Sequence, residues 1–212
     1  MISLRRLNHL ITLKAFGKRF AGDGRGVSAI EFALIAPVLI LLYLGMAELT
    51  LGLMASRRVS HLTATIGDLA AQSDTLTPDN VTDLWKIAGS MLDPFSTSIT
   101  VAGQPVSILR MRVASVTMQT VGSKTSAKVN WSMATNWTGF TNTSTEIQKI
   151  TTGQIAVGES LIVTQAEYDY DSPIHSPLAD FFKKNTKFTE IFYHHPRNGA
   201  AVTCTLCPVP AP

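Results

Sequence analysis

Charged residues are scarce in this chain: they make up 16% of its 212 residues, against about 25% in an ordinary soluble domain. Because chains that stay disordered are polar and highly charged, this composition excludes disorder throughout. Residues 1–26 hold six basic groups and one acidic group, and the rest of the chain holds 12 basic and 14 acidic groups. The body of the protein therefore lacks the clustered basic residues of a nucleic-acid-binding domain. We predict no nucleic-acid partner.

Cysteine is nearly absent, since the chain has only Cys204 and Cys207 in a single C-x2-C. A zinc ribbon needs a second pair of this kind or two suitably spaced histidines. His194 and His195 are adjacent, so in a strand they would point to opposite faces and would not share a metal ion. Outside the cytoplasm such a cysteine pair oxidises, and we predict a short-loop disulfide. Pairing between subunits is the alternative.

The sequence signatures of common catalytic sites are missing as well. The chain has no G-x-S-x-G, no H-E-x-x-H and no glycine-rich phosphate loop. Asp169 and Asp171 flank Tyr170 and would share a strand face, but we interpret them as turn-forming acids rather than as a calcium site. We predict no catalytic residue, no cofactor, no metal and no enzymatic activity. An enzyme whose catalytic groups meet only on folding is the alternative.

One long hydrophobic run stands out, from Phe32 to Ser56, with Glu48 as its single charged residue. About 20 helical residues cross the hydrocarbon core of a membrane, so this run is long enough to span one. Lysine and arginine are dense before the run and sparse just after it, which places the N-terminus in the cytoplasm and residues 57–212 outside. We predict a single-pass membrane protein. A secretory signal cleaved after Ala47 is the alternative.

Two residues within the run break its apolar character. Pro37 removes the hydrogen bond normally donated to Ala33. We expect a tolerated kink there, with a weak point that lets the helix bend during packing as the alternative. Glu48 lies 17 residues beyond Glu31, or about 25 Å along a helix. We expect Glu48 near the outer interface, with its carboxylate reaching to water.

A short motif, R-G-V-S-A-I-E-F, lies directly before the run, from Arg25 to Phe32. Its Glu31 is costly at the edge of a bilayer and needs a partner there. If the chain were cut after Gly26, Val27 would gain a free amine, which could pair with Glu31 of a neighbouring subunit. Desolvation offsets much of the attraction between such charges. The pair would therefore fix subunit register rather than add stability.

This arrangement resembles the type III signal of prepilins and pseudopilins, in which a membrane peptidase cuts after the glycine and a glutamate is the fifth mature residue. Counted from Val27, Glu31 is the fifth residue and Phe32 the sixth. In a secretory signal the apolar run precedes the cut, whereas here it follows. The resemblance therefore implies that the hydrophobic helix is retained after cleavage between Gly26 and Val27.

Among prepilins, the run G-V-S-A-I-E-F-A-L-I-A-P most resembles the TadE-like family of the tight-adherence (Flp) pilus system. The segment from Gly158 to Ile174, E-I-F-Y-H-H-P-R and the cysteine-containing tail are more weakly similar to that family. Major pilins of this system are much shorter than 212 residues, so the resemblance implies a minor pseudopilin or assembly factor of a type IV pilus. A pseudopilin of a type II secretion system is the alternative.

The resemblance also implies a location and partners. The protein would be anchored in the bacterial inner membrane, with a periplasmic C-terminal domain, and could be incorporated into a pilus. Its partners would be the prepilin peptidase, other pilin or pseudopilin subunits, the inner-membrane assembly proteins and the lipid bilayer.

Periodicity along the chain predicts an α+β, pilin-like fold: a long N-terminal transmembrane helix that continues into an amphipathic stem, then a small antiparallel β-sheet domain. After the stem, Thr77-Pro78-Asp79 predicts a second helix, ended by Asp93-Pro94. We expect strands at 98–102, 106–119, 126–136, 158–169 and 187–194, and a short helix at 178–184. Polar and apolar residues alternate around Arg110 and Arg112, which predicts that one face of the sheet contacts water (the wet face) and the other packs on the core. The predicted segments are 1–26 (cleaved leader), 27–56 (span), 57–73 (stem) and 74–212 (periplasmic domain with a frayed Pro-rich tail).

Overall fold

The computed structural model describes residues 26–174 and 186–210. The predicted leader, apart from Gly26, and the predicted helix at 178–184 lie outside the described residues. The chain divides into two compact units, an N-terminal unit (Met1–Ala47) and a C-terminal unit (Glu48–Pro212).

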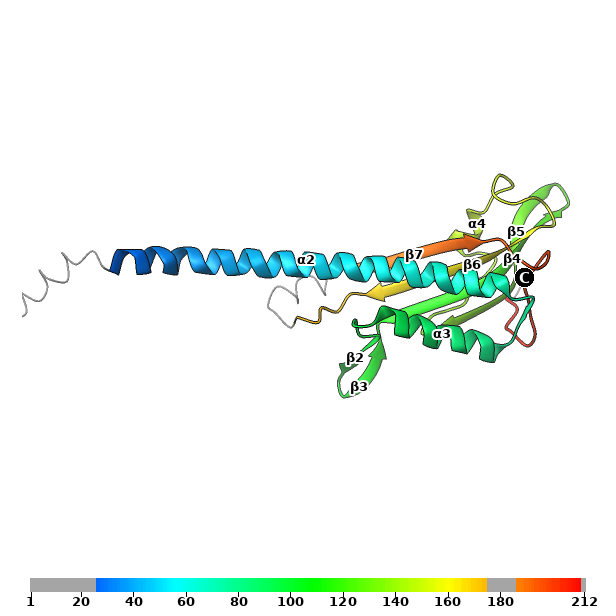
Figure 1. The fold of residues 1–212 in the computed structure, drawn as a ribbon. Coiled ribbons are helices and arrows are strands. Elements are labelled where there is room, and N and C mark those ends of the chain that lie inside the picture. Colours follow the sequence, from blue (N-terminus) through cyan, green and yellow to red (C-terminus); the bar gives the residue numbers. More distant parts are fainter. Residues whose placement is uncertain (1–25, 175–185, 211–212) are drawn as a thin grey trace, which may run out of the picture. The chain divides into compact units, whose positions relative to one another are not determined.

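Helix α2 (Val27–Gln72) is the longest element of the structure and contributes residues to both units (Figure 1). It is 46 residues long and continues on both sides of Pro37. The segment predicted to span the membrane and the predicted stem are thus parts of a single helix. Together with the antiparallel sheet that follows, this helix confirms the predicted α+β fold class.

The C-terminal unit is built on a four-stranded antiparallel sheet in the order β5-β4-β6-β7. Its strands are β4 (Leu109–Val121), β5 (Lys124–Thr135), β6 (Ser160–Asp169) and β7 (Lys187–His194). In the register, Leu109 lies opposite Tyr168 and Ile162 lies opposite His194. A separate hairpin pairs β2 (Ser98–Val101) with β3 (Gln104–Ser107), and β1 (Thr75–Leu76) pairs in parallel with β8 (Thr203–Cys204).

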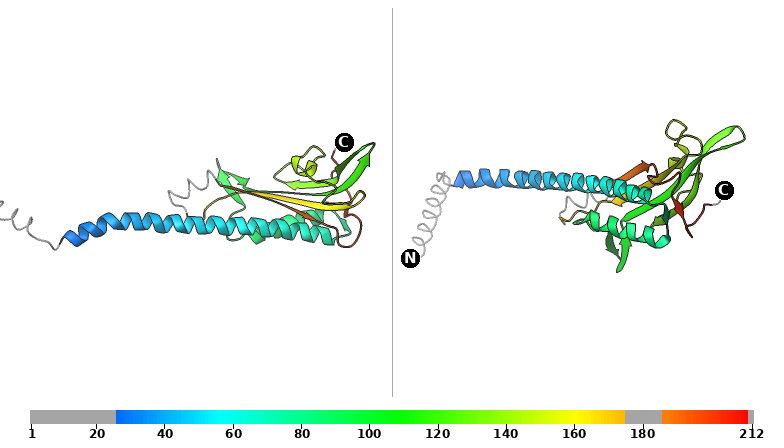
Figure 2. Two further views of the ribbon diagram at one scale, coloured as in Figure 1. Left: turned by 90° about the horizontal axis from the view of Figure 1, so that it is seen from above. Right: turned by 45° about the vertical axis from the view of Figure 1, so that its right-hand side comes forward.

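Helices α2 and α3 (Pro78–Leu92) cover one face of this sheet, as Figure 2 shows. The buried positions of α2 recur every three or four residues, so they form one stripe along its C-terminal part. Strand residues such as Met111, Val113 and Ile162 complete this core. The helical residues in it are Ala55, Val59, Leu62, Ile66, Ala70, Ala71, Val81, Leu84, Ala88 and Leu92.

The start of α3 follows the predicted capping pattern. The Asn80 N–H donates to Thr77 Oγ1 (3.3 Å), and the Thr77 N–H donates to Asn80 Oδ1 (3.0 Å), which makes a reciprocal capping box. Pro78 occupies the first helical turn, where its missing N–H costs nothing. The predicted helix start is confirmed, and the helix ends at Leu92, just before Asp93-Pro94.

The prediction that the other face of the sheet is wet is wrong. A second apolar cluster lies there, because the segment after β5, including the short helix α4 (Thr145–Gln148), folds over this face. Figure 2 shows this segment on the side of the sheet opposite α2. Alternation marked Arg110 and Arg112 as solvent-facing, yet nothing local in β4 shows that a later segment will cover Arg112. The members of the cluster are Ala114, Val116, Met118, Val129, Phe140, Ile147, Ile150, Ile155, Leu161 and Val163.

Arg112 joins that covering segment to the sheet. Its guanidinium lies 4.3 Å from the ring centre of Trp137 and 4.0 Å from that of Phe140. Its Nε and Nη2 donate to Gln165 Oε1 (2.9 and 2.7 Å), and Nη2 lies 3.3 Å from a Glu146 oxygen. Desolvation lowers the pKa of this guanidinium, and the nearby carboxylates oppose that shift. The buried charge is therefore held by stacking, hydrogen bonds and an ion pair together.

The C-terminal tail is fastened to the sheet at several points, so it is not frayed where the structure describes it. The Trp131 Nε1–H donates to the Val202 carbonyl (2.9 Å), and the Ser132 N–H donates to the Pro208 carbonyl (3.0 Å). A disulfide joins Cys204 and Cys207 within this tail. These bonds protect part of β5, which is an edge strand of the sheet.

Helix α2 lies very close to the sheet at Gly67. A Cβ at this position would lie 2.5 Å from His194 Nδ1 on β7 and 2.9 Å from Thr164 Oγ1 on β6. Real side chains do not tolerate such distances, so only glycine lets the helix come this near. By contrast, a Cβ at Gly89, in the interior of α3, would meet its nearest neighbour, Thr97 Cγ2, at an ordinary 3.8 Å.

We predict that Gly67→Ala destabilises the protein by about 1–3 kcal/mol, because the added methyl group overpacks the contact between helix and sheet. The matched variant Gly89→Ala should instead add about 0.5–1 kcal/mol, because alanine loses less backbone entropy in a helix. Denaturant unfolding of the full-length protein in detergent micelles measures both changes. A neutral or stabilising Gly67→Ala would contradict the close approach.

Candidate functional site: the exposed helix and its buried anchor

The predicted processing junction lies at the very start of α2. Gly26 precedes the helix, and Val27 is its first residue, with 52% of its surface exposed. Glu31 lies one turn further on, exposed, and has no salt-bridge partner within the described ranges 26–174 and 186–210. Phe32 is 70% exposed. Within the structure the junction and its acidic residue are therefore open to a peptidase or a partner.

An apolar surface follows this junction along the first 21 residues of α2. Between Val27 and Met46, each exposed large hydrophobic residue has more than half of its surface accessible to solvent. Water is a poor solvent for so much contiguous apolar surface, which typically marks a membrane or protein contact. Among the described residues, α2 is the one helix long and apolar enough to cross a membrane. The exposed large hydrophobic residues of this surface are Val27, Ile30, Phe32, Leu34, Ile35, Val38, Leu39, Ile40, Leu41, Leu42, Tyr43 and Met46.

The expectation that Glu48 reaches to water is wrong. Glu48 is 1% exposed and lies at the first position of the C-terminal unit. The Ser172 hydroxyl donates to its Oε1 (2.9 Å), and the Tyr170 hydroxyl donates to its Oε2 (3.4 Å). The chain after β6 thus folds back onto α2 and buries the carboxylate, a contact across 122 and 124 residues that no local pattern indicates.

Tyr170 links this buried carboxylate to the apolar core. Its ring centre lies 6.2 Å from that of Phe95 and 6.0 Å from that of Phe188, in tilted and edge-on arrangements. Desolvation raises the pKa of its hydroxyl, and the charge of Glu48 contributes in the same direction. The phenol therefore stays protonated and able to donate. Because a buried carboxylate is stable only with such donors, Glu48 ties its part of α2 to the segment after β6.

We predict that Glu48→Ala destabilises the protein by about 1–3 kcal/mol, because the Tyr170 and Ser172 hydroxyls would lose their acceptor. Glu48→Gln keeps an acceptor oxygen and should cost clearly less. A double-mutant cycle of Glu48→Gln with Ser172→Ala, measured by unfolding of the full-length protein, should give a coupling energy of about 0.5–3 kcal/mol. Equal losses for the alanine and glutamine variants, or no coupling, would contradict this role.

Asp169, one of the two acids that flank Tyr170, takes part in ion pairs across the sheet. Asp169 is the last residue of β6, and its carboxylate pairs with Arg110 on β4 (2.5 Å) and Lys187 on β7 (3.7 Å). Glu167 lies 2.8 Å from Arg110 and 3.0 Å from Lys187. These charges form a cross-strand network over three strands. Among the described residues no three histidine, cysteine or acidic side chains are grouped to hold a metal ion.

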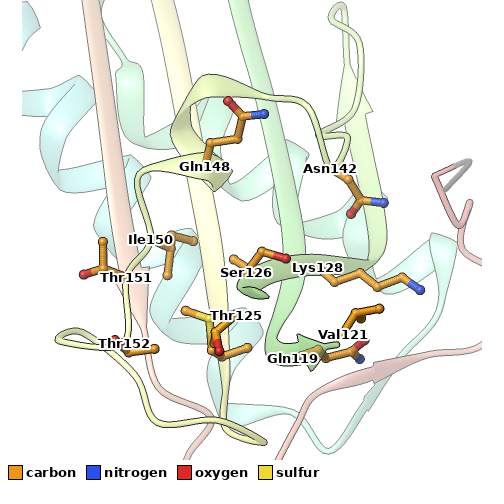
Figure 3. Close-up of a pocket in the computed structure, with 12 residues that line it drawn as sticks. Gln119, Val121, Thr125, Ser126, Lys128, Asn142, Gln148, Ile150, Thr151 and Thr152 are labelled. Atoms are coloured by element: carbon orange, nitrogen blue, oxygen red, sulfur yellow. The ribbon is translucent and has the colours of Figure 1, made fainter. Parts of the chain in front are cut away.

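A groove of about 800 Å³ lies between the β4–β5 hairpin and the segment from Gln148 to Thr152 (Figure 3). Threonine, serine and amide side chains dominate its lining, with Lys128 as the one titratable group among the lining residues. Asn142 at its rim already accepts a hydrogen bond from the Val129 N–H (2.8 Å). A single lysine without an acid or base beside it provides no proton-transfer pair. The lining of this groove therefore holds no pair of acid and base.

The two adjacent histidines lie in different surroundings. His195 is exposed, whereas His194 is partly buried against Gly67, and its Nδ1 has no hydrogen-bond partner in the described residues. Desolvation lowers the pKa of His194 below its ordinary value, with Asp68 opposing the shift and Arg197 adding to it. In the unfolded chain this imidazole takes up its proton near pH 6.5, but in the folded protein it does so only at lower pH.

Stability should therefore fall as the pH falls below about 6.5, because the unfolded state binds more protons there. The contribution of one histidine is at most about 1.4 kcal/mol per pH unit. We predict that His194→Asn reduces this slope, while the matched variant His195→Asn keeps it. Denaturant unfolding of the full-length protein between pH 5 and 8 (an interval spanning the ordinary histidine pKa of about 6.5) measures the slopes. Equal slopes for the two variants would contradict the burial of His194.

The fold and these contacts define a class before any comparison: an α+β protein whose N-terminal helix has the length and composition of a membrane span. The model of the family described as TadE-like protein matches residues 26–67. The match begins at Gly26 and continues along α2 to Gly67, so the resemblance predicted from the sequence is confirmed over this segment. Comparisons with curated proteins and with solved structures gave no match.

Proposed function

We propose that this protein is a minor pseudopilin or assembly factor of a tight-adherence type IV pilus. The observation that carries the proposal is the TadE-like match, which starts at Gly26, directly before the first residue of the long apolar helix. Helix α2 anchors the protein in the bacterial inner membrane as a single span. The N-terminus lies in the cytoplasm and the unit from Glu48 onward in the periplasm, following the excess of basic residues before the span.

A prepilin peptidase cuts this chain between Gly26 and Val27 and leaves the apolar helix on the mature protein. The exposure of both residues at the helix start supports this step. Cleavage gives Val27 a free amine, four residues before the Glu31 carboxylate. Since residues i and i+4 share one side of a helix, the two charges of one subunit lie on one face and can meet the opposite charges of a neighbour.

The exposed apolar surface of α2 serves in two environments. In the membrane its leucine, isoleucine and valine side chains contact lipid, and during assembly the same side chains pack against other pilin helices. Close helix packing can replace lipid contact, because it is driven by van der Waals contacts and by pairing of polar groups. Inside that apolar packing the pair between Val27 and Glu31 sets the axial register between subunits.

The role is structural rather than catalytic. The groove near Lys128 is lined by no acid–base pair, and the Glu48 carboxylate is buried and accepts hydrogen bonds from Tyr170 and Ser172. No feature of the described residues favours the enzyme or the type II secretion alternative over pilus assembly.

Co-expression of the full-length protein with a prepilin peptidase tests the processing step. We predict that the mature protein begins at Val27 and that Gly26→Leu leaves it uncut, because the bulky side chain blocks the position before the cleaved bond. Gly45→Ala, a matched glycine variant further along α2, should be processed normally. N-terminal sequencing and intact mass measure the outcome. A mature N-terminus at Met1 or Glu48, with the peptidase active on a control pilin, would contradict the proposal.

Glu31→Gln separates processing from assembly. We predict normal cleavage and membrane insertion but at least about tenfold less protein in purified pili, because the pair selects the correct register between subunits, and losing about 1.4 kcal/mol of that preference already gives this factor. Ser28→Ala, a neutral change on the preceding turn, is the control. Quantitative immunoblotting of purified pili and of membranes measures both pools. Incorporation of Glu31→Gln at the wild-type level would contradict the pairing role of Glu31. It would not bear on the processing step.

A further inference from the structure

A second groove, of about 590 Å³, lies on the C-terminal unit between α2 and the end of α3. It combines apolar and cationic side chains, and its lining includes no acidic residue. The lining residues are Thr50, Leu53, Met54, Arg57, Arg58, His61 and Met91.

The six α2 residues in this lining lie on one side of the helix, because they recur at intervals of three or four residues. They lie away from the stripe that faces the sheet, which includes Ala55 and Val59. Along the groove the lining changes from apolar to cationic side chains within about one helical turn. Leu53 and Met54 are 63% and 41% exposed, and Arg57 and Arg58 follow them.

Neither of the two guanidinium groups is neutralised by a carboxylate of the described residues. Arg57 is exposed, and neither arginine forms a salt bridge with any carboxylate in the described part of the chain. Arg58 donates one hydrogen bond to the Met91 carbonyl (3.2 Å), which holds its side chain against α3. A guanidinium has five N–H donors, so Arg58 keeps further donors for an anion.

We propose that this groove binds the phosphate headgroup of an anionic phospholipid, with an acyl chain lying along Leu53 and Met54. Guanidinium groups match phosphate in charge and in paired donor geometry. The apolar part of the groove continues along α2 into the span, which is where an acyl chain must lie. The inference rests on the proposed function, because it requires α2 to cross a membrane.

Such a site does more than attach the protein, because α2 is already anchored by its apolar length. A headgroup held by Arg57 and Arg58 fixes the depth and rotation of the helix at the outer surface of the membrane. The C-terminal unit begins at Glu48 on the same helix. Lipid binding therefore sets how this unit is presented to its partners before assembly.

Native mass spectrometry of the full-length protein, released from detergent with added lipid, tests the proposal. Phosphatidylglycerol and phosphatidylcholine with identical acyl chains are compared. We expect preferential retention of phosphatidylglycerol, and Arg57→Gln should weaken this binding about five-fold, the effect of one cationic residue at a membrane surface. Arg57→Lys should recover part of it, and Lys124→Gln, an exposed cation on the β4–β5 turn, should change nothing.

Several results would overturn the inference. Equal retention of the two lipids, or unchanged phosphatidylglycerol binding by Arg57→Gln, would show that the arginines do not select a headgroup. Inorganic phosphate that displaces phosphatidylglycerol at equal concentration would identify a free-anion site. An Arg57→Gln variant that keeps its lipid preference but fails to enter pili would assign the groove to a protein partner.

Resistance of the wild-type protein to carbonate extraction from membranes is measured in parallel. Extraction of the wild-type protein would overturn the membrane anchoring on which the proposed function depends. Full resistance without a preference for phosphatidylglycerol would overturn the lipid site alone.

Discussion

Between Glu48 and Ala71, helix α2 lays a stripe of small and branched side chains on one face of the sheet, and this packing positions the other elements of the C-terminal unit. Gly67 lets the helix come close enough to touch His194 and Thr164. Between Ala55 and Ala71 the other buried residues are alanine, valine, leucine and isoleucine, together with Thr63. The same helix begins at Val27, so its residues contribute both to the N-terminal unit and to the core of the C-terminal unit.

Two buried charged groups fix the register of long-range contacts, which apolar packing alone would not specify. Glu48 receives hydroxyl donors from the segment after β6, and Arg112 stacks between Trp137 and Phe140 from the segment after β5. Burying a charge is costly unless its donors and acceptors are in place, so each contact is satisfied in one register only. They serve specificity of the fold more than its stability.

Local patterns predicted much of this protein. The capping box at Thr77 and Asn80, the apolar run after Gly26 and the alternation in the strands each depend on neighbours within a few residues. The start of α3, the approximate positions of β2, β5, β6 and β7, and the TadE-like segment could therefore be predicted without a structure, whereas the break between β3 and β4 could not. The wet face expected for β4 could not, because its cover comes from the later segment around Phe140. Glu48 was misplaced for the same reason, since Tyr170 and Ser172 lie more than a hundred residues away.

The sequence alone thus determined the two main helices and the central strands, and that one helix suits a membrane, whereas it missed β1, α4 and β8 and joined β3 to β4 in one expected strand at 106–119. Only the tertiary structure decided which polar groups are buried and which cations stay unpaired. The physical reason is that hydrogen-bond capping and side-chain periodicity act within one or two turns, whereas burial depends on which distant segment covers a surface. Arg112 and Arg57 illustrate this: both are arginines beside apolar residues, yet one is enclosed by aromatic rings and the other faces an open groove.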